Sequence, residues 1–94
     1  RTSLMDTAYE AILDAILSGR LPAGEAVSEV TLASELGISR TPVAHAVQRL
    51  ARIGLIERPA GRQPRVAKFD RDEVVEVYEM RELLEAEAAA RAAT

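Results

Sequence analysis

The chain has 94 residues and no cysteine, so it is long enough for one small domain and forms no disulfide or thiolate metal site. One Phe and two Tyr leave the core to aliphatic side chains. No apolar run reaches membrane-spanning length and we find no signal peptide, so we expect no membrane partner and a cytoplasmic location. Because so short a chain leaves few residues for a cleft, we expect no enzyme, no cofactor and no metal site.

Charge is divided unevenly along the chain. The formal net charge is −3, which taken alone argues against a nucleic-acid partner. Residues 39–68, however, contain seven basic residues and one acidic residue, whereas residues 70–94 contain eight acidic and three basic residues. The basic stretch favours contact with phosphates, and the negative charge of the acidic end offsets its positive charge in the net charge of the whole chain.

The first predicted element is an amphipathic helix over about residues 3–18. Gly19 stands where the helical pattern ends, in a position typical of a helix C-terminus. The turn that follows contains Pro22 and Gly24, two residues that favour reversal of the chain. The apolar and small residues of the helix recur at helical spacing, and we expect them to pack: Leu4, Ala8, Ala11, Ile12, Ala15 and Ile16.

Residues 28–53 predict a helix-turn-helix. Ser28 is a candidate N-cap for a short helix, and Gly37 permits the sharp turn after it. Ser39 is a second candidate cap, and Pro42 falls in the next helix's first turn, where its missing amide hydrogen has no acceptor to lose. Gly54 closes this second helix. The residues expected to face the core are Val30, Leu32, Ala33 and Leu36 in the first helix, and Val43, Ala46, Val47, Leu50 and Ile53 in the second.

Two short strands are expected next, at residues 55–58 and 65–69, around a turn rich in Pro and Gly. A basic hairpin placed directly after a helix-turn-helix is typical of a winged helix. The predicted fold class is therefore mainly α with a small β-hairpin: a winged helix-turn-helix over residues 1–69, followed by a C-terminal α-helix within residues 70–94. In such a fold the helix at about 39–53 enters the major groove of DNA, and the wing at about 58–65 contacts backbone or minor groove.

Several segments resemble the GntR family of bacterial transcription regulators, and in particular its FadR/FCD-like subfamily. The matching segments are Gly19–Gly24, Leu32–Ala33, Leu36–Val43, Arg49–Leu50 and Gly54–Ile56. The resemblance implies a metabolite-responsive regulator, with repression as the expected output, that binds a palindromic operator in double-stranded DNA as a homodimer. It also implies that residues 70–94 are a linker and the first helix of a truncated helical domain. The small-molecule effector site and the dimer contacts would then lie outside this fragment, which opens at Arg1 rather than Met.

Two positions depart from the family pattern. Relatives often have Arg-Glu-Ala-Leu after Pro-Val, but here Ala44 occupies the position of the frequent DNA-contacting arginine. His45 and Gln48 are the obvious substitutes, and Ala44 itself could touch a thymine methyl group. In the wing, Gln63 and Pro64 replace a frequent glycine, which changes the wing tip.

The candidate DNA-binding residues fall into three groups. Residues near the start of the second helix are expected to hold phosphates: Ser39, Arg40 and Thr41. Residues expected to face base edges are Ala44, His45 and Gln48. The remaining candidates are basic side chains: Arg49, Arg52, Arg62 and Arg65. Each also has a simpler interpretation, namely capping for Ser39, solvation for the exposed residues, and a salt bridge to Glu35 or Asp14 for Arg49.

The acidic C-terminal helix leaves two possibilities open. Its apolar residues face either a missing domain or a partner helix: Val74, Val77, Tyr78, Leu84 and Ala88. Asp70 and Asp72 are expected to cap the helix or complement its dipole. The alternative function is a winged-helix protein-interaction module that does not bind DNA. An RNA-binding role is weaker still, because the chain lacks an aromatic stacking surface.

Overall fold

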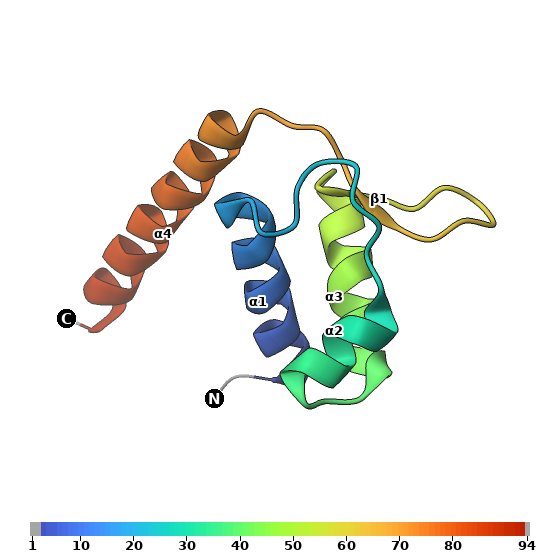
Figure 1. The fold of residues 1–94 in the computed structure, drawn as a ribbon. Coiled ribbons are helices and arrows are strands. Elements are labelled where there is room, and N and C mark those ends of the chain that lie inside the picture. The colour runs from blue at the N-terminus through green and yellow to red at the C-terminus, as the bar shows by residue number, and fades with distance from the viewer. Residues whose placement is uncertain (1–2, 94) are drawn as a thin grey trace.

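The computed structural model describes the backbone of residues 3–93 and the side chains in that range except those of residues 71, 81, 85 and 87–93. The elements in chain order are α1 (Leu4–Ser18), α2 (Glu29–Leu36), α3 (Arg40–Arg52), β1 (Ile56–Glu57), β2 (Arg65–Val66) and α4 (Arg71–Ala93). The first three helices form one group, the hairpin extends from it on one side, and α4 extends on the side of α1 (Figure 1). The predicted mainly α winged-helix architecture is confirmed.

Helix ends follow the capping residues of the sequence. The Ser28 hydroxyl accepts a hydrogen bond from the Thr31 amide at 3.1 Å, and Gly37 ends α2 with a φ of +68°. Ser39 occupies the N-cap position of α3, but its side chain makes no capping hydrogen bond. Asp70, as expected, caps α4 by accepting from the Glu73 amide at 3.2 Å. Local sequence therefore sets the helix boundaries, apart from the missing cap bond at Ser39.

The core lies mainly between α1 and α3. Its fully enclosed large side chains are Ile12, Ile16, Val27, Val43, Val47, Leu50 and Val66. Leu32, Leu36 and the turn residue Ile38 pack against this core from the helix-turn-helix side, half-buried. The three helices are thus held together by aliphatic packing, which removes apolar area from water.

Three apolar residues expected to pack are instead largely exposed. Leu4 lies in the first turn of α1, where few residues cover it, and is 56% exposed. Val30 is 57% exposed and lines a hollow between α2, the start of α3 and the wing. Ile53 is 48% exposed, since α3 ends at Arg52 and the helical spacing no longer fixes the direction of the next side chain.

The hairpin is shorter than predicted, with two residues in each strand. Ile56 pairs with Val66 and Glu57 with Arg65 in antiparallel register. Pro64 has no amide hydrogen to donate, which limits the ladder at this end. The opposite edge of β2 is covered by residues 24–27: the Val66 amide donates to the Glu25 carbonyl at 2.9 Å, and the Gly24 amide donates to the Val66 carbonyl at 2.7 Å. This third segment attaches the wing to the chain before α2.

Helix α4 contacts the winged helix through part of its first two turns. Val74 and Tyr78 are half-buried and pack against the core of the winged helix itself, rather than facing a missing domain or a partner helix. Val77, Met80, Leu83 and Leu84 are exposed, while Ala88 lies outside the described side chains. No helix among the described residues is both long and apolar enough to span a membrane.

Candidate nucleic-acid interface

Helix α3 has one buried and one exposed face, as its periodicity predicts. Val43, Ala46, Val47 and Leu50 are completely buried. The opposite face carries exposed side chains that are able to donate or accept hydrogen bonds: Thr41, His45, Gln48 and Arg52. Ala44 is half-buried between the two faces. A helix packed on one side with polar groups on the other is the element that enters a DNA groove in this fold.

Four predicted contact residues share one hollow along this face. His45, Gln48, Arg49 and Arg52 line it, together with Met5 at the start of α1, and its volume is about 330 Å³. Met5 was not anticipated from the sequence, because nothing in the local pattern of α1 predicts its approach to α3. The arrangement places an imidazole, an amide and two guanidinium groups side by side, which are groups that bind base edges and phosphates.

Arg49 is held within the protein, although not by the partners expected. Its guanidinium lies 3.5 Å from the Asp6 carboxylate and 3.9 Å from the centre of the Tyr9 ring, stacked over its face. Asp14, one of the two expected partners, instead pairs with Arg20 at 2.9 Å. The spacing of charges along the sequence did not reveal Asp6, because α1 crosses α3 near its own N-terminus. Arg49 therefore has a structural role that competes with phosphate binding.

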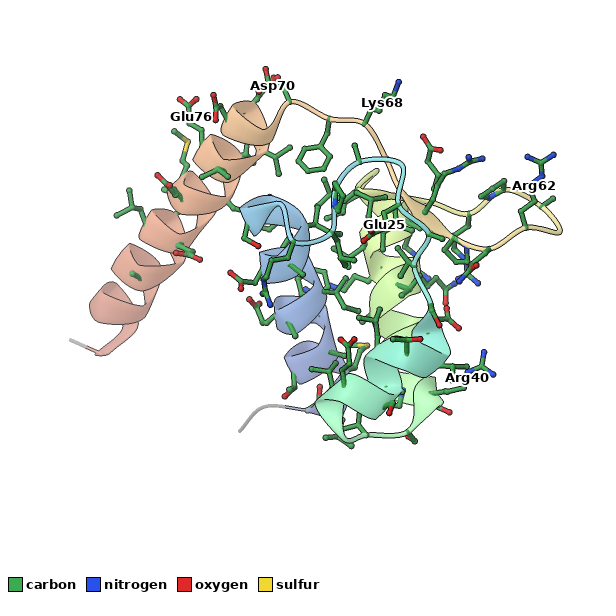
Figure 2. The ribbon with its side chains drawn as sticks, viewed as in Figure 1. Glu25, Arg40, Arg62, Lys68, Asp70 and Glu76 are labelled. Carbon is green, nitrogen blue, oxygen red and sulfur yellow. The ribbon has the colours of Figure 1, made fainter. Side chains whose placement is uncertain are left out.

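The beginning of α3 and the wing form a second part of the surface. The Arg40 side chain is 65% exposed and its Nη2 lies 3.6 Å from Oε1 of Glu29 in α2. Arg62 is exposed on the wing loop, and Figure 2 shows Arg40 and Arg62 projecting from the same side of the molecule. Ser39 and Thr41 are both exposed beside Arg40. The side chains predicted to hold phosphates thus lie together with the N-terminus of α3, an arrangement that favours an anion.

Arg65 differs from Arg62, because it lies in β2 rather than at the tip of the wing. It is half-buried, and its Nε lies 3.4 Å from Oε2 of Glu57 on the paired strand. The cross-strand pair Glu57–Arg65 satisfies part of its charge. Arg65 consequently supports the base of the wing, and Arg62 is the more available of the two cations.

A second hollow connects α2, α3 and the wing, with a volume of about 200 Å³. Its polar lining residues are Ser28, Glu29, Arg40, Arg58 and Gln63. The Gln63 amide nitrogen donates to the Val27 carbonyl at 3.3 Å, so the residue that replaces the frequent wing glycine is tied to the chain before α2. Glu29 was missed as a site residue, because an acidic residue in a first turn is adequately explained by the helix dipole.

The exposed arginines of α3 and the wing lie away from the acidic start of α4. Arg40 and Arg62 project on the side of the wing, whereas Asp70 and Glu76 lie at the start of α4, away from it (Figure 2). Lys68 lies between these regions, at the top of the view. Within the described part of the chain, no three His, Asp or Glu side chains gather as a metal site. Arg40 and Arg62 are therefore separated in space from the two labelled acids of the C-terminal segment, although Glu25 lies on the side of the wing.

Comparison with known proteins agrees with this geometry. The family model described as "Bacterial regulatory proteins, gntR family" matches residues 4–66, more than half of the chain. A "Probable D-xylose utilization operon transcriptional repressor" of Paenarthrobacter nicotinovorans is 37% identical over 85 residues, which is 90% of this chain and 38% of that protein. The crystal structure of a GntR-family transcriptional regulator from Pseudomonas syringae is 33% identical, with a TM-score of 0.64, over 90% of this chain and 37% of that one.

A third match supports the fold alone. A GntR-family transcriptional regulator from Listeria monocytogenes is 21% identical but superposes with a TM-score of 0.77, over 95% of this chain and 80% of that one. Of the length of the Paenarthrobacter and Pseudomonas proteins, in contrast, this chain spans under two fifths. By sequence and fold, the chain belongs to the gntR family of bacterial regulatory proteins, which are transcription regulators with a DNA-binding helix-turn-helix and are not enzymes.

Proposed function

We propose that this chain reads an operator through the exposed face of α3 in the major groove, with Arg62 of the wing on the adjacent backbone or minor groove. Two observations carry the proposal: α3 has an exposed polar face, and Arg40 and Arg62 project on one side of the molecule, away from Asp70 and Glu76 at the start of α4. Ser39, Arg40 and Thr41 hold phosphates and fix the register of the helix. The relatives named as transcriptional regulators favour this function over a docking module that ignores DNA.

In this proposal, base readout falls to His45 and Gln48. Ala44 stands where relatives often have an arginine, a residue able to make two hydrogen bonds to guanine. The Ala44 methyl group is able to contact a thymine methyl group instead. Gln48 is able to make the paired hydrogen bonds that recognise adenine. The operator is therefore expected to differ from those of relatives that have arginine at this position.

The full protein is proposed to be a homodimer of the FadR/FCD-like subfamily that binds a palindromic operator in the cytoplasm. Its effector, a small organic acid or related metabolite, binds in a further helical domain, and the winged helix itself needs no cofactor. Repression is the proposed output, since the Paenarthrobacter relative is named a repressor. Helix α4 is the proposed beginning of that domain, because its exposed apolar side chains would be buried by packing against further helices: Val77, Met80, Leu83 and Leu84.

The test is a fluorescence-anisotropy titration of the chain against a pool of random duplexes at two salt concentrations, with sequencing of the bound fraction. With about three phosphate contacts in each subunit, the log–log salt dependence of a dimer should have a slope of about −5. Enrichment of a short palindrome, with salt-sensitive binding, is the expected result. A complete lack of binding at low salt and high protein concentration would favour the docking module instead.

A further inference from the structure

An ion pair joins the two helices of the helix-turn-helix at the edge of the DNA-facing surface. Arg40 is the first residue of α3 and Glu29 is the first residue of α2. Their closest atoms, Nη2 and Oε1, are 3.6 Å apart, which is an ion-pair distance rather than that of a hydrogen bond. The arginine end is 65% exposed, but the glutamate side chain is only 14% exposed. The carboxylate is therefore the enclosed member of the pair, and the guanidinium is the member open to a ligand.

The burial of Glu29 is unusual for an acid beside a phosphate-binding surface. Its second oxygen, Oε2, is buried and accepts no hydrogen bond from the described part of the chain. Unpaired carboxylates are seldom buried, since removing a charge from water is unfavourable unless a cation compensates it. Arg40 and Arg58 line the same hollow and are the cations available to do so. A helix-dipole role alone requires no such burial, because an exposed acid in the first turn serves it equally well.

We propose that Glu29 is a positioning residue for DNA binding, whose carboxylate holds the Arg40 guanidinium in the orientation that meets a phosphate. This inference rests on the proposed function, because it assigns to Glu29 an effect on the same DNA-facing surface. An arginine side chain has many rotamers, and restricting them before binding reduces the entropy lost when the contact forms. The planar guanidinium can face the carboxylate with one edge and present its remaining N–H groups to a phosphate.

Simple charge repulsion makes the opposite prediction. A carboxylate close to the phosphate backbone repels it, so removing that charge should raise the affinity for DNA. If Glu29 positions Arg40, neutralising it should lower the affinity in spite of the more favourable net charge. The sign of the change therefore separates the two explanations.

The experiment measures the dissociation constant of Glu29→Gln by anisotropy on the duplex that the wild-type chain enriches, or on the random pool at low salt. We expect binding about 3- to 10-fold weaker than wild type, the size usual for coupled neighbours. The matched control is Glu35→Gln, which removes the same charge from an exposed position of the same helix. Its affinity should be equal to that of wild type or slightly higher.

A double-mutant cycle tests whether the effect passes through Arg40. Arg40→Ala should weaken binding, and adding Glu29→Gln to it should cause no further loss. Glu29→Asp serves as the second variant, because it keeps the negative charge at the start of α2 but shortens the side chain. The positioning role predicts weaker binding for Glu29→Asp as well, whereas a role limited to the helix dipole predicts normal binding. Circular dichroism at the titration temperature establishes that each variant is folded.

The outcomes distinguish this inference from the proposed function. If the wild-type chain shows no salt-sensitive binding, the proposed function fails. If Arg40→Ala weakens binding but Glu29→Gln binds as tightly as wild type or more tightly, DNA binding stands and the positioning role is overturned. An equal loss from Glu29→Gln in the presence and absence of Arg40 also overturns it, since the effect would then not pass through the arginine.

Discussion

The hydroxyl groups of Tyr9 in α1 and Tyr78 in α4 are hydrogen-bonded at 2.9 Å. Tyr9 is 5% exposed, and the face of its ring is covered by the Arg49 guanidinium from α3. The Tyr9 side chain of α1 thus contacts two other helices, α3 through the ring and α4 through the hydroxyl. Tyr9 consequently contributes both to the position of α4 on the winged helix and to the packing of α3.

Tyr9→Phe is expected to lower the free energy of unfolding by about 1 kcal/mol, the usual net contribution of one hydrogen bond. The ring, and with it the contact to Arg49, is retained in this variant. Tyr9→Leu removes both interactions and should be more destabilising, because the cation–π contact is lost as well. Urea denaturation followed by circular dichroism measures both. Equal stability of Tyr9→Phe and wild type would show that the hydroxyl pair contributes nothing to holding α4.

Ser28 and Ser39 occupy equivalent N-cap positions but should respond differently to replacement by alanine. Ser28→Ala removes the hydrogen bond to the Thr31 amide and should lower stability by about 1 kcal/mol. Ser39→Ala removes no capping hydrogen bond, so its effect on stability should be within about 0.5 kcal/mol. If Ser39 holds a phosphate, its replacement should instead weaken DNA binding. Denaturation and anisotropy titration of both variants test the pair, and equal destabilisation by the two would contradict the assignment.

Much of the fold was predictable because its signals are local. Gly19 and Gly37 end helices, and Ser28 begins one, through the conformations of single residues. The buried face of α3 follows from spacing along one helix. Ile53 was wrongly placed in the core because the same spacing was extended beyond the end of that helix, where it no longer determines direction.

The parts of the candidate site that the sequence did not reveal depend on segments far apart in the chain. The pairing of residues 24–27 with β2, and of Asp6 with Arg49, joins positions whose approach has no local signature. Glu29 was overlooked for a related reason. Its position at the start of a helix explains an acidic residue locally, and only the burial of its side chain points to a further role. The exposed polar face of α3 was accessible to sequence reasoning because the same periodicity defines both faces of a helix.

Gly37 sets the turn between α2 and α3, and its replacement should be unfavourable for the backbone alone. Its φ is +68°, and a Cβ added there would meet no atom within 4 Å. Gly37→Ala should therefore lower stability by about 1 to 2 kcal/mol through the left-handed conformation rather than through a clash. Gly37→Asn should be less harmful, because asparagine adopts this conformation more readily. The two melting temperatures test this order, with about 4–8 °C expected for each kcal/mol in a domain of this size.

Gln48 and Arg62 should affect DNA binding in different ways, because Gln48 is proposed to face bases in the major groove and Arg62 to contact the backbone or minor groove. Arg62→Ala should weaken binding to all sequences similarly and reduce the salt slope by about 1 for each lost phosphate contact. Gln48→Ala should lose about 1 to 3 kcal/mol of discrimination at one base pair and leave the salt slope unchanged. Arg20→Ala is the matched control for charge, since Arg20 lies in the turn after α1 and pairs with Asp14 of that helix. Anisotropy at several salt concentrations, on the selected operator and on single-base variants, separates these effects. A loss of base preference from Arg62→Ala would place Arg62 in the minor groove rather than on the backbone. A uniform loss from Gln48→Ala would contradict base readout by Gln48.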